Sequence, residues 1–108
     1  MYIMGWVTMT GDADYGIFPL YHSSNHGSPG NRFFYTNPVV DALLEEGRMS
    51  GDPARRAAIY REVTEILIYD APTVFLFHPF QPVGTNGITG LVTDFNVTPY
   101  FHNVRLLG

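Results

Sequence analysis

A pair of carboxylates in the segment TGDADYG is the first feature of the sequence that could do chemistry. Asp12 and Asp14 are separated by a single residue. Two neighbouring carboxylates can transfer protons when their surroundings separate their pKa values. A carboxylate can also cap a helix, or it can hold an ammonium group through charge-assisted hydrogen bonds. The residues by themselves leave all three roles open.

Two histidines have a spacing that can bind a metal. His22 and His26 form an H-x-x-x-H pattern, which on a helix would place both imidazoles on one face. The intervening Ser-Ser-Asn and the following Gly-Ser-Pro-Gly favour a loop instead, and no Glu follows the first His as it does in zinc proteases. We therefore expect both histidines on a surface loop, and we predict no metal site and no cofactor.

The remaining residue types offer no nucleophile. The chain has no cysteine, no Gly-rich phosphate loop and no G-x-S-x-G motif. We therefore expect no catalytic residue and no enzymatic activity. Trp6, the single tryptophan, follows Gly5; an indole in this position can belong to a core or form the floor of a pocket.

The composition restricts the class of protein further. The chain has 108 residues, of which 45% are hydrophobic and 15% are charged, and this indicates one small globular domain. Its formal net charge is −4, and its six basic residues are scattered apart from Arg55-Arg56. Nucleic-acid binding needs clustered positive charge, and a membrane span needs ~18 consecutive apolar residues. Neither feature is present, so we expect no nucleic-acid partner and no membrane span.

Local patterns predict the elements that position the candidate residues. Residues 1–9 are apolar and aromatic, which is typical of a short strand. Asp12 or Asp14 could begin a short helix through IFPLY, and Pro19 would limit the length of that helix. Residues 22–32 are rich in Gly, Ser and Asn and predict a loop.

Two further helices begin at a capping residue followed by proline, which is favoured at the first helical position. Asn37-Pro38 starts the first of them, and Gly47 is expected to end it in the left-handed conformation. Asp52-Pro53 starts the second, which is expected to run to about Asp70.

The second of these helices has one apolar stripe, which predicts one buried face. Its charged residues, Arg55 and Arg56 among them, are expected on the solvated surface. The residues of the stripe are Ile59, Val63, Ile66 and Leu67.

The rest of the chain predicts β structure. Residues 73–77, TVFLF, do not alternate in polarity, so we expect a strand buried on both faces. After Pro79, proline and glycine interrupt short β-like runs such as residues 90–95 and 102–107. The order strand, loop, helix, helix, strand and irregular β predicts an α/β or α+β fold.

Four segments occur together in order: GW, TGDADYG, FFYTNPVVDALLEEG and DPARRAAIYREVTEILIYDAPTVFL. In combination they resemble the C-terminal part of the family 5 extracellular solute-binding proteins, which are the dipeptide- and oligopeptide-binding subunits of ABC importers. The resemblance runs from about Met4 to Leu106. TGDADYG with the following PLYHSSNHG is similar to the branch that includes glutathione-binding proteins and certain oligopeptide-binding proteins.

The resemblance implies a partial lobe of a periplasmic-binding-protein type II fold. Residues 1–78 would form the C-terminal half of the second ligand-binding lobe, and residues 79–108 a β-rich tail that crosses back to the other lobe. Family members are several times longer, so the chain is expected to be a fragment of a parent whose lobes close by hinge bending. That parent would be extracytoplasmic, either periplasmic or a membrane-anchored lipoprotein, with an ABC permease as its partner.

The resemblance also implies a peptide ligand, whose backbone pairs with strand-like backbone of the protein. The candidate ligand-binding residues are Trp6, Asp12, Asp14 and Tyr15. In dipeptide-binding members, an Asp three residues after this Trp holds the ammonium group of the ligand. Met9 stands at that position here. A gapless alignment places Asp12 and Asp14 on a later acidic pair of the family, whereas a short gap aligns Asp12 with the anchor.

Two other hypotheses remain open. One is a small acidic enzyme that uses Asp12 or Asp14 with a histidine such as His22 or His78. The other is an interaction domain whose exposed β edges pair with another chain. The latter is compatible with a binding fragment, and we expect the isolated chain to self-associate through residues 73–108.

Overall fold

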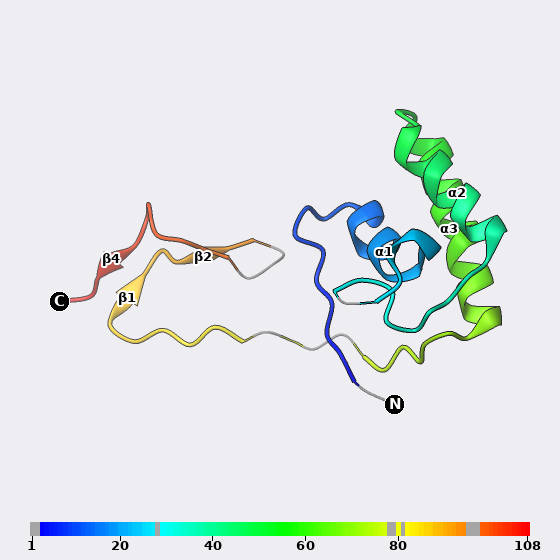
Figure 1. The fold of residues 1–108 in the computed structure, drawn as a ribbon. Coiled ribbons are helices and arrows are strands. Elements are labelled where there is room, and N and C mark those ends of the chain that lie inside the picture. The colour runs from blue at the N-terminus through cyan, green and yellow to red at the C-terminus, as the bar shows by residue number, and fades with distance from the viewer. Residues whose placement is uncertain (1–2, 28, 78–79, 81, 95–97) are drawn as a thin grey trace. The chain divides into compact units, whose positions relative to one another are not determined.

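A computed structural model describes residues 3–27, 29–77, 80, 82–94 and 98–108. The chain forms two compact units, Met1–Phe75 and Leu76–Gly108. The first unit contains α1 (Ala13–Tyr21), the 3-10 helix η1 (Ser23–Asn25), α2 (Pro38–Met49) and α3 (Pro53–Asp70), whereas the second contains short strands (Figure 1). The predicted class, a mixture of helices and strands, is confirmed.

The helices α2 and α3 begin at the caps that the sequence predicted, and α1 begins at one of the two candidate caps. Asn37 Oδ1 accepts a hydrogen bond from Val39 N at 3.0 Å, and Asp52 Oδ1 accepts one from Ala54 N at 3.0 Å. Asp12 caps α1 in the same way. These contacts satisfy N–H groups that have no partner within the helix.

The ends of the helices follow the prediction less closely. α3 ends at Asp70 as expected, where Ala71 adopts the left-handed conformation with φ 47°. The predicted end of α2 at Gly47 is wrong, because α2 continues to Met49 and is capped by Ser50.

Gly47 serves the packing of two helices instead. A Cβ atom at Gly47 would lie 3.1 Å from Cζ of Tyr60 and 3.3 Å from Cγ2 of Ile59. Both of these neighbours are buried. A glycine at this position therefore lets α3 approach α2 closely, since it has no side chain.

The core of the first unit lies between its helices. α2 and α3 run antiparallel and side by side (Figure 1), and α1 packs against α2. The apolar stripe predicted on α3 faces this core, although Ile66 is only partly buried. The buried hydrophobic residues are Leu20, Tyr21, Val40, Leu44, Ile59, Tyr60, Val63 and Leu67.

Two predicted strands are not formed. Residues 3–9 and 73–77 are irregular, and Val74 and Phe77 are exposed over 80% and 78% of their surfaces rather than buried. A strand needs a second strand to accept and donate its backbone hydrogen bonds. The first unit includes residues 3–9 and 73–75, and its described residues contain no sheet that could supply one.

The second unit confirms the irregular β structure that was predicted after Pro79. Two antiparallel pairs form, with Ile88 opposite Leu106 and Val92 opposite Tyr100. None of the described residues of this unit is buried. The strands are β1 (Ile88–Thr89), β2 (Val92–Thr93), β3 (Pro99–Tyr100) and β4 (Arg105–Leu106), and β1 pairs with β4 and β2 with β3.

Within the described residues, none of the helices combines the length and the apolar composition that crossing a bilayer requires.

Candidate ligand-binding site

Two of the four candidate residues form one aromatic surface. The indole Nε1 of Trp6 donates a hydrogen bond to the backbone carbonyl of Tyr15 at 3.1 Å. The two rings are stacked, with centroids 6.0 Å apart and an interplanar angle of 23°. Trp6 is partly buried against the core, whereas Tyr15 remains 38% exposed. The two rings therefore meet where the segment before α1 passes the first turn of that helix.

Asp12 has both a local and a long-range partner. Its Oδ1 atom accepts a hydrogen bond from Asp14 N at 2.8 Å and so caps α1. Both of its oxygens also accept hydrogen bonds from Nη2 of Arg56, at 2.6 and 2.7 Å. The capping role that the sequence left open is confirmed, and the Asp12 carboxylate is already paired with a cation.

Asp14 is paired with a second arginine. Arg48 donates from Nε to Oδ1 at 3.1 Å and from Nη2 to Oδ2 at 3.0 Å, which is the two-pronged geometry that arginine favours with a carboxylate. The Cζ atom of Arg48 also lies 3.5 Å from the centroid of the Phe18 ring. The guanidinium is therefore held by an ion pair and by an aromatic ring together.

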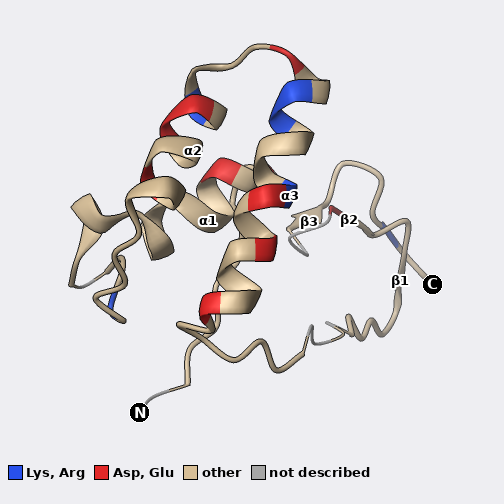
Figure 2. Cartoon of the chain, turned by 90° about the vertical axis from the view of Figure 1, so that its right-hand side faces the viewer, with Lys and Arg blue, Asp and Glu red and all other residues tan. Residues whose placement is uncertain are grey.

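The turn between α2 and α3 brings the two arginines to one place. Arg48 lies in the last turn of α2 and Arg56 in the first turn of α3. Basic residues accordingly occupy the ends of these helices that the connecting loop joins (Figure 2). This end of the helix pair lies against the start of α1, where both candidate aspartates are.

A buried phenol lies close to this group of charges. The Tyr60 hydroxyl has no hydrogen-bond partner among the described residues, and its ring lies 5.3 Å from Cζ of Arg56. Burial raises the pKa of Tyr60, and the Asp14 carboxylate raises it further, whereas Arg56 opposes the rise. Charged groups of the site therefore influence the pKa of a buried core residue.

His22 is buried, which corrects the expectation that it lies on a surface loop. Its Nδ1 atom accepts a hydrogen bond from Ser24 N at 3.1 Å and so caps η1. The imidazole stacks on Phe18 with centroids 4.3 Å apart, and its Nε2 atom lies 3.4 Å from a carboxylate oxygen of Glu45. The polar composition of residues 22–32 predicted a surface loop. The turn at η1 instead places the His22 ring against Phe18 of α1.

His26, among the described residues, forms no acid–base pair with either candidate aspartate. His26 is exposed, as predicted, and its Nε2 atom lies 3.0 Å from the backbone carbonyl of Tyr35. His78 is outside the described residues. Across the part of the chain that the structure describes, no cluster of three His, Asp or Glu side chains could hold a metal ion.

Sequence reasoning missed the arginines of the site. Arg56 was expected on a solvated surface, but its side chain is only 22% exposed. The available signal was charge: two carboxylates close together at one helix start repel each other, and arginines from elsewhere in the chain can offset that repulsion. Nothing in the sequence pattern shows which cations these are.

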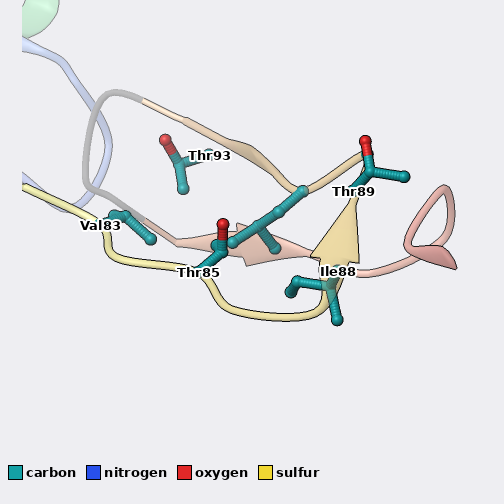
Figure 3. A pocket seen from close by; sticks show the side chains of 7 residues that line it. Val83, Thr85, Ile88, Thr89 and Thr93 are labelled. Carbon is teal, nitrogen blue, oxygen red and sulfur yellow. The ribbon is translucent and has the colours of Figure 1, made fainter. Parts of the chain in front are cut away.

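A depression of about 340 Å³ lies in the second unit and includes none of the candidate residues. Threonine and aliphatic side chains surround it (Figure 3). No titratable side chain lines it, so it supplies no charge to a ligand. Its lining residues are Val83, Thr85, Ile88, Thr89, Gly90, Leu91 and Thr93.

Comparison with known proteins gives partial matches. No family model matches the chain. The chain is 45% identical over 69 residues to Protein XP55 of Streptomyces lividans, which covers 63% of this chain and 13% of that protein. It is 32% identical over 75 residues to the glutathione-binding protein GsiB of Escherichia coli strain K12 and of Shigella dysenteriae serotype 1, which covers 68% of this chain.

The chain thus spans only 15% of the length of these glutathione-binding proteins. The partial homology supports the resemblance to family 5 solute-binding proteins at the level of the family. The relatives whose names state an activity are binding proteins rather than enzymes.

Proposed function

We propose that the chain is part of the extracytoplasmic peptide-binding subunit of an ABC importer, which captures a peptide between two lobes and delivers it to a permease. The observation that carries this proposal is the local homology to glutathione-binding proteins. Residues 1–78 would supply the C-terminal half of one lobe, and residues 79–108 a tail that crosses to the other lobe.

The proposed ligand contacts are Trp6, Asp12, Asp14 and Tyr15. The stacked rings of Trp6 and Tyr15 offer an aromatic surface against which the flat peptide groups and apolar side chains of a ligand can pack. Asp12 would accept the ammonium group of the ligand, because 48% of its side chain is exposed. The ammonium must then share this carboxylate with Arg56.

The proposed function includes no catalysis. Both candidate carboxylates accept hydrogen bonds from guanidinium groups, so their oxygens are already engaged in charge-assisted hydrogen bonds. A carboxylate positioned in this way suits the binding of a ligand's donor groups.

Titration of the chain with glutathione tests the proposed site by nuclear magnetic resonance, which detects weak binding. We expect the amide signals of Trp6 and of residues 12–15 to shift at millimolar glutathione. N-acetylated glutathione, which lacks the ammonium group, should shift the signals of residues 12–15 less. Shifts confined to other residues, or none at tens of millimolar, would contradict the assigned site.

Two matched variants separate the charge of Asp12 from its capping role. Asparagine caps helices about as well as aspartate, so Asp12→Asn keeps the cap of α1 and removes the charge. Asp52→Asn makes the same change at the start of α3, where Asp52 caps the helix. We expect the preference for free over acetylated glutathione to disappear in Asp12→Asn and to persist in Asp52→Asn.

The isolated chain should bind the ligand only weakly, because it would supply one side of the cleft. We expect a Kd of about 1 mM or above, which corresponds to about −4 kcal/mol. Calorimetry on the monomer measures this value. Submicromolar binding would show that the chain carries a complete site by itself.

A further inference from the structure

We infer that Arg48 and Arg56 are positioning residues that hold residues 10–15 in the conformation in which they contact a ligand. The inference rests on the proposed function for what this segment binds. The hold itself is a property of the chain and can be measured without a ligand.

Each arginine is fixed by contacts besides its carboxylate. Arg48 lies over the Phe18 ring while it pairs with Asp14. Arg56 donates from Nη1 to the backbone carbonyl of Gly47 at 2.5 Å, and its guanidinium lies beside Tyr60. Exposed ion pairs are individually weak because two flexible side chains must be ordered. Here the additional contacts have already ordered the guanidinium groups.

Apart from the turns of α1 and the contact of Tyr15 with Trp6, the segment has few connections among the described residues. Gly11 N donates to Thr8 O at 3.3 Å, and Asp12 N donates to Thr10 Oγ1 at 3.2 Å. Both hydrogen bonds lie within the segment and its immediate neighbours, and neither ties it to α2 or α3. The two carboxylates make those connections, one to each helix.

The two ion pairs also fix the orientation of residues 10–15. Asp12 and Asp14 are two residues apart and reach arginines on two different helices. Two such attachments prevent the segment from turning about either one. They place Tyr15 where its backbone carbonyl accepts from Trp6 and its ring stacks on the indole. Loss of the arginines should therefore loosen the aromatic surface as well as the carboxylates.

Amide hydrogen exchange tests the inference, with a third arginine as the control. Arg55 pairs with Glu46 and so also joins α2 to α3, but it does not touch residues 10–15. In Arg48→Gln/Arg56→Gln we expect exchange of residues 10–16 to rise about tenfold, while the buried turns of α2 and α3 stay within about threefold. Arg55→Gln should leave residues 10–16 unchanged.

Conservative variants keep the test decisive if the double variant unfolds. Lysine keeps the charge but cannot form the two-pronged pair or stack in the same way. Arg48→Lys and Arg56→Lys should therefore raise exchange of residues 10–16 less than the glutamine variants do. Trp6 fluorescence should shift in the same order, because the indole stacks on Tyr15. A uniform rise over the whole first unit, or no rise at residues 10–16, would overturn the inference.

Ligand titration separates this inference from the proposed function. One outcome is that the wild-type chain shows no amide shifts with glutathione while the arginine variants exchange faster at residues 10–16. In that case the positioning role of the arginines is supported and the proposed function fails. If the wild type responds and Arg48→Gln/Arg56→Gln responds with the same affinity, the positioning role fails and the proposed function stands.

Discussion

At the scale of single residues, Asp12 and Asp52 both cap a helix, and Asp12 has a second role besides. Both accept a hydrogen bond from the amide two residues later and begin a helix. Only Asp12 also pairs with an arginine from another helix through both of its oxygens. The first role depends on neighbours in sequence, whereas the second depends on how the helices pack.

The buried hydroxyl of Tyr60 predicts an unusual response to phenylalanine. A buried hydroxyl without a partner costs free energy, so its removal should be neutral or stabilising. We expect Tyr60→Phe to raise the free energy of unfolding by about 0–1 kcal/mol. Tyr21→Phe is the control, because the Tyr21 hydroxyl lies 2.8 Å from Thr73 Oγ1.

In that control a hydrogen bond is lost, and the free energy of unfolding should fall by about 1 kcal/mol. Urea unfolding of both variants measures the difference. A loss of stability in Tyr60→Phe as large as in Tyr21→Phe would indicate that the Tyr60 hydroxyl has a partner in solution.

At the scale of elements, the packing of α2 against α3 depends on Gly47. Alanine normally stabilises a helix relative to glycine by about 1 kcal/mol. Here its methyl group would press on two buried side chains, so we expect Gly47→Ala to lower the free energy of unfolding by about 1–3 kcal/mol. Gly51→Ala is the control, since nothing lies within 4 Å of a Cβ at that position.

Thermal unfolding of the two alanine variants measures this effect. Gly47→Ala should unfold at a lower temperature than the wild type, and Gly51→Ala at nearly the same temperature. An unchanged or higher midpoint in Gly47→Ala would show that the two helices separate without cost.

Hydrogen bonds to Asp70 connect the start of α2 to the end of α3 and make the free energy of unfolding depend on pH. Asp70 Oδ2 accepts hydrogen bonds from the Tyr35 hydroxyl at 2.5 Å and from Asn37 Nδ2 at 2.9 Å. The hydrogen bond from Tyr35, and then that from Asn37, lower the pKa of Asp70 below its ordinary value. Its contribution to stability is therefore full above the ordinary carboxyl pKa and is lost as pH falls through the lowered value.

Asp70→Asn should therefore be less stable than the wild type near neutral pH, and the difference should shrink in strong acid. Urea midpoints measured across this range test the sign. A difference that persists below the lowered pKa would show that the carboxylate charge is not the cause.

The partner of Asp70 gives the matching test at high pH. Burial, together with the hydrogen bond to Asp70, raises the pKa of Tyr35 to about 12. Because the neutral phenol is favoured in the folded chain, its contribution is present below the ordinary tyrosine pKa and is lost as pH rises through about 12. Ultraviolet titration should show a phenol that ionises with a pKa of about 12, and Tyr35→Phe should remove that step.

At the scale of the whole molecule, the two units differ in what can stabilise them. Every buried hydrophobic residue among those described belongs to Met1–Phe75. Leu76–Gly108 is shorter than the roughly 40 residues below which domains usually need disulfides or metals. We expect residues 1–75 to unfold cooperatively by circular dichroism and residues 76–108 to show no transition. A cooperative transition in the second fragment would contradict this.

Self-association through residues 73–108 stays a prediction at the same scale. Exposed apolar residues such as Val74, Phe77 and Phe80 provide its physical motive, because unpaired extended segments of this kind can join other chains. Sedimentation at increasing concentration measures it. A strictly monomeric profile at high concentration would count against it.

The starts of α2 and α3, and a start of α1 at Asp12 or Asp14, were determined by the sequence alone. The Asn37-Pro38 and Asp52-Pro53 starts, the stripe on α3 and the cap at Asp12 depend on residues two to four positions apart. Helical hydrogen bonds are equally local, so a short segment contains the information for its own helix. The same holds for the choice of Asp12 and Asp14 as residues with chemistry.

Tertiary structure decided what depends on distant partners. Residues 73–77 have the composition of a buried strand but form none and are exposed, and His22 sits in a polar segment yet packs inside. The pairing of Asp12 with Arg56 and the close contact at Gly47 needed the packing of three helices. In each case the free energy comes from groups far apart in the chain, and a one-dimensional pattern does not record which of them meet.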